Sequence, residues 1–181
     1  MSSTTLWEIL PGLPVYGPMA EPFSSTGQGT HREGLVVSFC PPTGSWVGNF
    51  QRGLSSLDEV FAHPNGRHVV VVAGGTAYVV DSDRHSLVEH FGGQIEQILI
   101  VPANGLVLLG NGLWFEALGP AGTAWRSRRI SWDGMRKVSL SGTVVRGEAY
   151  APEGSDGTWH PFELDVMTGA VSGGSYNFPP M

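Results

Sequence analysis

His68-Val-Val-Val-Val-Ala-Gly-Gly75-Thr-Ala-Tyr78-Val-Val-Asp81 is the stretch that decides the fold of this chain. Two short apolar runs, rich in β-branched residues, lie on either side of a Gly-Gly dipeptide. Runs of this length and composition, separated by a turn signal, are typical of β-strands. The stretch therefore predicts two strands joined by a turn, and a further turn and strand, Ser86-Leu-Val88, follow it.

The segment that precedes this stretch recurs along the chain. Leu57-Asp-Glu-Val60-Phe-Ala-His-Pro64-Asn-Gly66 is matched by Ile95-Glu-Gln-Ile98-Leu-Ile-Val-Pro102-Ala-Asn-Gly105, and Met135-Arg-Lys-Val138-Ser-Leu-Ser-Gly142 is a weaker third copy. Self-similarity at this period indicates an array of supersecondary units.

A second element, consisting of a strand, a tight turn and a strand, occurs four times, at residues 39–47, 80–88, 116–125 and 164–171. The turn-entry positions Cys40, Asp81, Ala117 and Asp165 are separated by 41, 36 and 48 residues, near the propeller-blade length of about 40 to 45 residues. Asp at a turn entry accepts hydrogen bonds from backbone N–H groups two residues on. Asp81 and Asp165 are therefore expected to have structural roles.

These repeats predict an all-β fold, a propeller-like array of about four antiparallel blades. Residues 1–33 are rich in Pro, Gly and Ser and predict an irregular segment with one candidate closing strand at 6–10, and residues 34–181 the propeller-like domain. For the best unit, strands are expected at 68–73, 76–80, 86–91 and 96–101. The array is either a small closed ring or an open half-ring, and a second copy would cover the edges of a half-ring.

Four aliphatic residues of these strands, Val70, Val72, Ile98 and Val107, are predicted to be in the core. The single cysteine, Cys40, cannot form an internal disulfide, which favours a reducing compartment, and its expected role is that of a small buried hydrophobe. The chain start lacks the pattern of a secretory signal, and the apolar runs are too short to span a membrane. We therefore expect a cytoplasmic protein without a membrane partner.

Charge and motifs narrow the range of functions. The 181 residues carry a formal net charge of −6 and only one lysine, Lys137, which argues against nucleic-acid binding and suits a basic protein partner. Nucleophile-elbow, phosphate-loop and dinucleotide motifs do not occur, and the histidines, among them His63, His85, His90 and His160, lack metal-ligand spacing. No catalytic residue, metal ligand or cofactor is predicted, and His63 is assigned to a turn.

The most unusual stretch is Trp125-Arg-Ser-Arg-Arg-Ile-Ser-Trp132-Asp133. If it is a strand, then Arg126, Arg128, Ile130 and Trp132 share one face. Exposed Trp and Arg residues are typical of binding hot spots and also suit carbohydrate or anion contacts. Arg126, Arg128, Trp132 and Asp133 are therefore the candidate binding residues. In the alternative interpretation, Trp132 packs between blades and the arginines pair with surface carboxylates.

Four motifs carry a resemblance to a known group of proteins. They are Gly48-Asn49-Phe50-Gln51, the segment Ala73-Gly-Gly75-Thr-Ala-Tyr78-Val-Val-Asp81, Ile130-Ser-Trp132-Asp133-Gly134, and residues 162–176. Together they make residues 34–176 resemble a family of small bacterial β proteins that look like propeller fragments and are encoded near polymorphic toxins. The resemblance implies an immunity protein and transfers no catalytic residue.

Two functions of different classes remain open. The first is a non-enzymatic protein-binding module, most concretely an immunity protein that neutralises a cognate bacterial toxin by occlusion. The second is a propeller that binds a carbohydrate or an anion, or hydrolyses a substrate, at a site on the ring axis. Function depends on sites placed on a fold, so the fold class does not decide between them.

Overall fold

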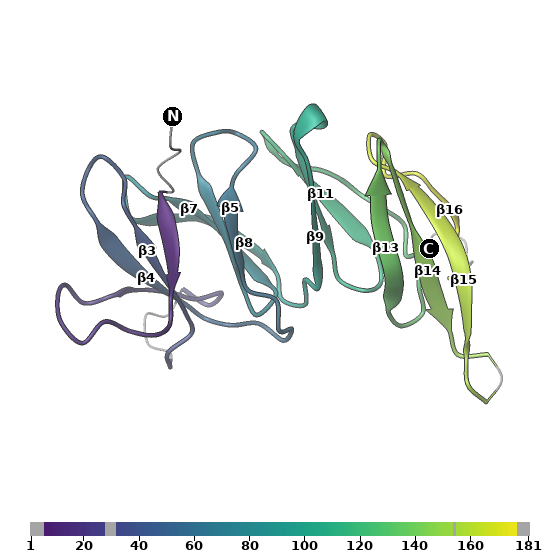
Figure 1. Ribbon diagram of the computed structural model, residues 1–181, viewed down its shortest axis with the longest axis horizontal. Coiled ribbons are helices and arrows are strands. Elements are labelled where there is room, and N and C mark those ends of the chain that lie inside the picture. The colour runs from purple at the N-terminus through teal and green to yellow at the C-terminus, as the bar shows by residue number, and fades with distance from the viewer. Residues whose placement is uncertain (1–5, 28–31, 154, 177–181) are drawn as a thin grey trace. The chain divides into compact units, whose positions relative to one another are not determined.

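The computed structural model describes residues 6–27, 32–153 and 155–176, and over these residues the chain is all-β, as predicted (Figure 1). Sixteen strands and one 3-10 turn, η1 (Pro102–Asn104), make up the regular structure of this part. The chain divides into two compact units, Met1–Ile95 and Glu96–Met181. Each unit contains two four-stranded sheets.

The first sheet of unit 1 combines β1 (Trp7–Leu10), β3 (Leu35–Phe39), β4 (Trp46–Phe50) and β2 (Glu21–Phe23), in that order. The strands β1 and β3, and β3 and β4, pair antiparallel, whereas β2 pairs parallel to β4. Both edge strands thus come from the Pro-rich N-terminal segment. Strand β1 lies at the candidate strand 6–10, while β2 lies in a part that composition predicted to be irregular.

The second sheet of unit 1 is a meander of β5 (Glu59–Ala62), β6 (Val69–Ala73), β7 (Thr76–Asp81) and β8 (Ser86–Gly92). The last three match the predicted strands. The prediction that residues 96–101 complete this sheet is wrong, because β5 supplies the remaining strand and pairs with β6. Only residues 93–96 separate β8 from the next strand, so the connection is as short as a hairpin loop although it leads to another sheet.

The two sheets of unit 1 share one apolar core. Phe39 and Trp46 of the first sheet stack with their ring centroids 4.4 Å apart, and Phe23 stacks on Phe50 at 4.7 Å. The second sheet contributes the alternate residues of β6 and β7, which are fully or almost fully buried: Val69, Val71, Ala73, Tyr78 and Val80. Each sheet thereby covers the apolar face of the other, as two-layer packing requires.

Unit 2 also consists of two four-stranded sheets that share one core. The first sheet is a meander of β9 (Gln97–Val101), β10 (Leu106–Gly110), β11 (Phe115–Gly119) and β12 (Gly122–Arg126). The second sheet is a meander of β13 (Met135–Ser141), β14 (Val144–Ala151), β15 (Thr158–Asp165) and β16 (Val171–Gly173). Their shared core includes Leu108 and Phe115 from the first sheet and Phe162 and Leu164 from the second. Ile130 and Val166, which lie outside the strands, complete this core.

The sequence repeats coincide with equivalent strands. The copies of the first element fall on β5, β9 and β13, each of which begins a sheet, and the copies of the second fall on the hairpins β3–β4, β7–β8, β11–β12 and β15–β16. One turn-entry position is wrong. Ala117 is a buried mid-strand residue of β11, because this hairpin has a two-residue turn at 120–121 and is shorter than its counterparts.

Val70, Val72 and Val107 are buried, which confirms their prediction, whereas Ile98 is only partly buried. Strand β9 carries four consecutive apolar residues, so a period of two cannot select its core face. Val101 and Leu99 occupy that face, and Ile98 lies on the other. Cys40 is exposed and not buried as expected, because it follows β3 at the entrance to a turn.

Within residues 6–27, 32–153 and 155–176, the structure contains no helix with the length and hydropathy that a bilayer crossing requires.

Two separate variants, in each of which Ala replaces an aliphatic residue on one of the neighbouring strands β9 and β10, test this packing. Leu108→Ala, at a fully buried position of β10, should lower the free energy of unfolding by about 2 to 5 kcal/mol, because it removes buried methyl groups and leaves a cavity. Ile100→Ala, at a half-exposed position of β9, should change it by no more than about 0.5 kcal/mol. Urea denaturation measures both, and equal effects would contradict the assigned register.

Candidate functional site

The predicted strand through residues 125–132 does not form as a whole. Strand β12 ends at Arg126, and residues 127–130 have no regular structure. Ile130 is fully buried in the core of unit 2, and its backbone N–H donates to the carbonyl of Leu113 at 2.7 Å. The expectation that Arg126, Arg128, Ile130 and Trp132 share one strand face is therefore wrong. The candidate residues are distributed over separate contacts.

Arg126 lies against the hairpin β11–β12. Its guanidinium donates from Nε and a terminal nitrogen to the Glu116 carboxylate, at 3.1 and 2.9 Å, and lies over the Trp114 ring at 5.7 Å. This is the surface ion pair that the alternative interpretation expected. Because the Arg126 side chain is largely exposed to solvent, the contribution of this pair to stability is small.

Arg128 binds the backbone at the end of β16 and in the residues that follow it. Its guanidinium donates to the carbonyl oxygens of Gly173 and Tyr176, at 2.6 and 2.9 Å, and to that of Arg129 at 2.9 Å. The fixed fork of an Arg side chain suits such multiple acceptors. Arg128 thus holds residues 173–176 against the segment that follows β12.

Trp132 is the candidate residue whose aromatic ring is both exposed and held by neighbours. It is 37% exposed. Its ring meets Tyr176 edge to face with the centroids 4.9 Å apart, and the Arg129 guanidinium lies 4.6 Å from the Tyr176 ring and 5.8 Å from Trp132. We define Arg129, Trp132 and Tyr176 as the Trp132 patch.

Hydrogen bonds to backbone groups also hold the Trp132 patch in place. Arg129 donates to the carbonyls of Ser131 and Trp132, at 2.8 and 2.6 Å, and the Trp132 N–H donates to the hydroxyl of Ser175 at 3.2 Å. Asp133 is exposed in the turn that follows. Sequence reasoning missed Tyr176, since a contact across 44 residues leaves no local pattern, and it did not include Arg129 among the candidate residues.

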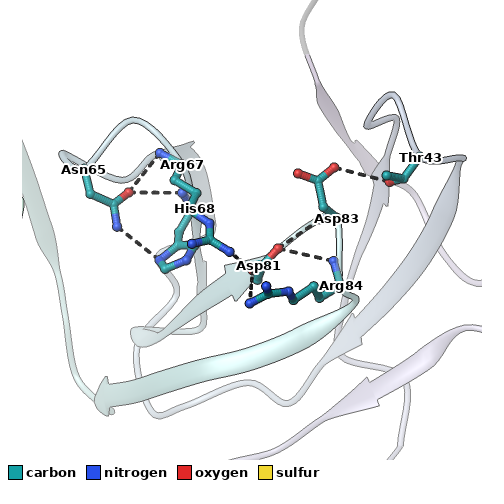
Figure 2. A network of polar contacts seen from close by, with 7 residues as sticks. All are labelled: Thr43, Asn65, Arg67, His68, Asp81, Asp83 and Arg84. Carbon is teal, nitrogen blue, oxygen red and sulfur yellow. Dashed lines mark hydrogen bonds and ion pairs between the residues drawn. The ribbon is translucent and has the colours of Figure 1, made fainter.

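A network of polar contacts lies in unit 1 around Asp81, the last residue of β7 (Figure 2). The carboxylate is almost completely buried, and it accepts from the backbone N–H groups of Asp83 and Arg84 and from the Arg67 guanidinium at 2.9 Å. Burial favours the neutral acid, but the Arg84 N–H and the Arg67 charge outweigh it, so the pKa of Asp81 is lowered.

This network has the structural role that the turn pattern predicted. Asp165 occupies the equivalent place at the end of β15, where Oδ1 accepts from the Thr168 hydroxyl and N–H, both at 2.8 Å, and from the Met167 N–H at 3.0 Å. These bonds, led by the one from the Thr168 hydroxyl, lower the pKa of Asp165. Both carboxylates are occupied in closing their turns.

His63 is buried in the turn between β5 and β6. The turn is closed by the Gly66 N–H, which donates to the His63 carbonyl at 2.9 Å, and Nδ1 of His63 accepts from the Asn65 N–H at 3.1 Å. The turn role predicted for His63 is therefore confirmed. Burial lowers the pKa of His63 below 6.5, although its hydrogen bond with Asn65 opposes the shift.

Unit 2 also has an open cavity of about 350 Å³ along β14, β15 and β16. It is lined by Val144, Glu163, Asp165, Ala170, Val171 and Ser172. The Glu163 carboxylate is bound by Arg146 at 2.7 Å, and Asp165 closes its turn. The two acids that line this cavity thus have structural partners. Among the described residues, no three His, Cys, Asp or Glu side chains are grouped as a metal ion would require.

Comparison with known proteins gives no family. No family model matches the chain, and no curated protein matches it. Among solved structures, it is similar to a crystal structure of a eukaryotic initiation factor, with 11% identity over 78% of this chain and 40% of the other and a TM-score of 0.43. It is also similar to Kluyveromyces lactis Hsv2p, with 7% identity over 79% of this chain and 57% of the other and a TM-score of 0.32. The chain thus matches less than two thirds of the length of each.

Substitutions at Asp81 test its role in the turn. Asp81→Ala removes the acceptor of two backbone N–H groups and the partner of Arg67, so the free energy of unfolding should fall by about 1 to 3 kcal/mol. Asp81→Asn keeps one acceptor oxygen and should cost less. Asp83→Ala, at the exposed neighbouring position, should have an effect within about 0.5 kcal/mol. Denaturation at neutral pH distinguishes the three, and an Asp81→Ala variant as stable as the parent would refute the assignment.

The environment of His63 predicts a loss of stability in mild acid. The folded state holds the imidazole neutral below pH 6.5, whereas the unfolded chain binds a proton there. The free energy of unfolding should therefore decrease as the pH falls from 6.5 toward the lowered pKa of His63, and level off below it. His63→Asn, which keeps an acceptor in the turn, should flatten this profile, and His90→Gln, at an exposed position, should retain it. Thermal melts between pH 7.5 and 5 provide the test, and an unchanged slope in His63→Asn would exclude this origin.

Proposed function

We propose that this protein is a non-enzymatic protein-binding module, most concretely an immunity protein that occludes a cognate bacterial toxin. In this proposal the four sheets are the blades of a propeller-like array, and the protein acts in the cytoplasm. The rigid sheets supply a scaffold, and exposed side chains outside the strands make the contacts.

The observation that carries this proposal is the Trp132 patch. Trp and Arg residues dominate the binding energy of protein interfaces, and Tyr is enriched with them. Here Trp132 is partly exposed while Tyr176 and Arg129 hold its ring in place. A side chain that is ordered before binding loses less conformational entropy when a partner covers it. The patch thus has the properties of an interface anchor.

The charge of the chain supports a basic partner. The formal net charge is −6, and a charge of this sign accelerates association with a positively charged protein and disfavours acidic competitors. Exposed carboxylates such as Asp133, next to the patch, are suited to the rim of such an interface. The resemblance to proteins encoded beside toxins makes the products of the flanking genes the first partners to examine.

Titration against the products of the two flanking genes tests this function. One of them should bind with a 1:1 stoichiometry, because occlusion uses one copy for each target. Trp132→Ala should weaken binding by about 2 kcal/mol or more, which is a factor of roughly thirty in Kd. Isothermal titration calorimetry measures both quantities.

Trp159 provides a matched control for Trp132. It is also a partly buried Trp of unit 2, with Arg136 over its ring at 4.1 Å and Tyr150 edge to face at 5.3 Å. Trp159→Ala should leave affinity within a factor of about three. Equal losses for Trp132→Ala and Trp159→Ala would indicate general destabilisation. Turnover of a small substrate that one His or Asp substitution abolishes in a folded variant would favour the enzyme.

A further inference from the structure

Residues 11–20 form a loop that joins the two edge strands of the first sheet in unit 1. Strand β1 pairs with β3 along one edge, and β2 pairs with β4 along the other, so the loop must pass from one side of this sheet to the opposite side. Its two ends are thereby fixed to the sheet. We refer to residues 11–20 as the 11–20 loop (Figure 1).

The 11–20 loop exposes its apolar side chains to solvent. Val15, Tyr16 and Met19 are 85%, 90% and 93% exposed, and Leu13 is also exposed. Single exposed apolar residues are common on protein surfaces, but several in one short segment mark an interaction site. Tyr and Met are, in addition, among the residues enriched at protein interfaces.

Several features restrict the conformations of this loop. Pro11, Pro14 and Pro18 fix their φ angles, and the Leu13 N–H donates to the Glu33 carboxylate at 3.3 Å. A restricted loop loses less entropy on binding than a flexible one, so more of the contact energy is retained as affinity. A restricted loop with exposed apolar side chains is suited to entering a recess in a partner.

The charges beside the loop indicate the chemistry of that recess. Glu8 in β1, Glu21 in β2 and Glu33, which binds the loop, are acidic. The basic groups beside them are Arg32, next to Glu33 in the chain, and His85, whose Nδ1 lies 2.9 Å from Glu21 Oε1. Carboxylates in the majority favour a rim of Lys or Arg on the partner. They also disfavour an anionic membrane surface, which attracts basic segments.

We propose that the 11–20 loop inserts Tyr16 and Met19 into an apolar pocket of the partner protein, and that Lys or Arg side chains surround the mouth of this pocket. The proposal rests on the proposed function and specifies the partner's chemistry. The loop belongs to unit 1, whereas the Trp132 patch belongs to unit 2.

A double substitution in the loop tests this assignment against the flanking-gene product that binds the parent chain. Tyr16→Ser combined with Met19→Ser should weaken binding by a factor of roughly thirty or more. The matched control is Val88→Ser combined with Met167→Ser, at apolar positions that are about half exposed, and it should bind like the parent. All four positions are exposed, so thermal melts should show both double variants as stable as the parent.

The rim charges have a separate readout. Glu8→Gln combined with Glu33→Gln should slow association and reduce its dependence on salt, while dissociation changes little. Stopped-flow measurements at low and physiological ionic strength record this. Unchanged association rates would remove the basic rim from the proposal.

The remaining outcomes overturn the loop assignment, either alone or together with the proposed function. If the parent and Trp132→Ala differ in affinity but the loop variant binds like the parent, the loop assignment is wrong and the proposed function stands. If neither flanking product binds the parent, the proposed function fails and the loop assignment fails with it. Tyr16-dependent partition into phosphatidylcholine–phosphatidylglycerol vesicles would instead make the loop a membrane contact, and Tyr16-dependent dimerisation in sedimentation experiments would make it a self-association site.

Discussion

The apolar face of each sheet must be covered by a second sheet, and the other features of the structure follow from this constraint. A sheet with an apolar face must bury that face against another element. In unit 1 the aromatic rings of the first sheet, such as Phe39 and Phe50, meet the alternate valines of β6. In unit 2 residues such as Leu108 and Phe162 make the equivalent layer. The sequence is repetitive because each of the two sheets in a unit has an apolar face that it must bury.

This packing determines where the polar residues go. Asp81 and Asp165 lie at strand ends, where they close turns through backbone N–H groups, whereas Glu116 and Glu163 lie within strands and pair with arginines. Arginines stabilise the irregular segments between strands, as Arg128 does by binding the carbonyls of residues 173 and 176. The side chains left for recognition therefore lie mostly outside the strands. Trp132 lies in such a segment, and Tyr16 lies in a loop.

The features that depend on residues close together in the chain were predicted correctly from the sequence. The alternation of strands, the turn role of His63 and the turn carboxylates were all readable from short patterns of apolar, Gly and Asp residues. The sequence was a poorer guide to which strands belong to the same sheet. The four-residue connection at 93–96 does not differ in length from a hairpin loop, so β9 was assigned to the wrong sheet.

Long-range contacts explain the other errors. Strand β2 is held by parallel pairing with β4, 27 residues away in the chain, and its Pro-rich surroundings gave no sign of a strand. Residues 127–130 leave the strand geometry because Ile130 is drawn into the core of unit 2. The candidate site was therefore predicted in part: Trp132 has the exposure expected of it, whereas Arg128 is used by the fold and Tyr176 joins the patch from a distant segment.

In the proposed function, rigid sheets present exposed side chains from the segments between strands to a protein partner. Hydrogen–deuterium exchange of the chain, alone and saturated with the flanking-gene product that binds it, tests this claim directly. We expect new protection in residues 129–133 of unit 2 and in the 11–20 loop of unit 1, with the slow exchange of β6, β7, β10 and β14 unchanged. Protection confined to the turns closed by Asp81 and Asp165, or to the cavity beside β16, would show that the partner does not bind through these segments.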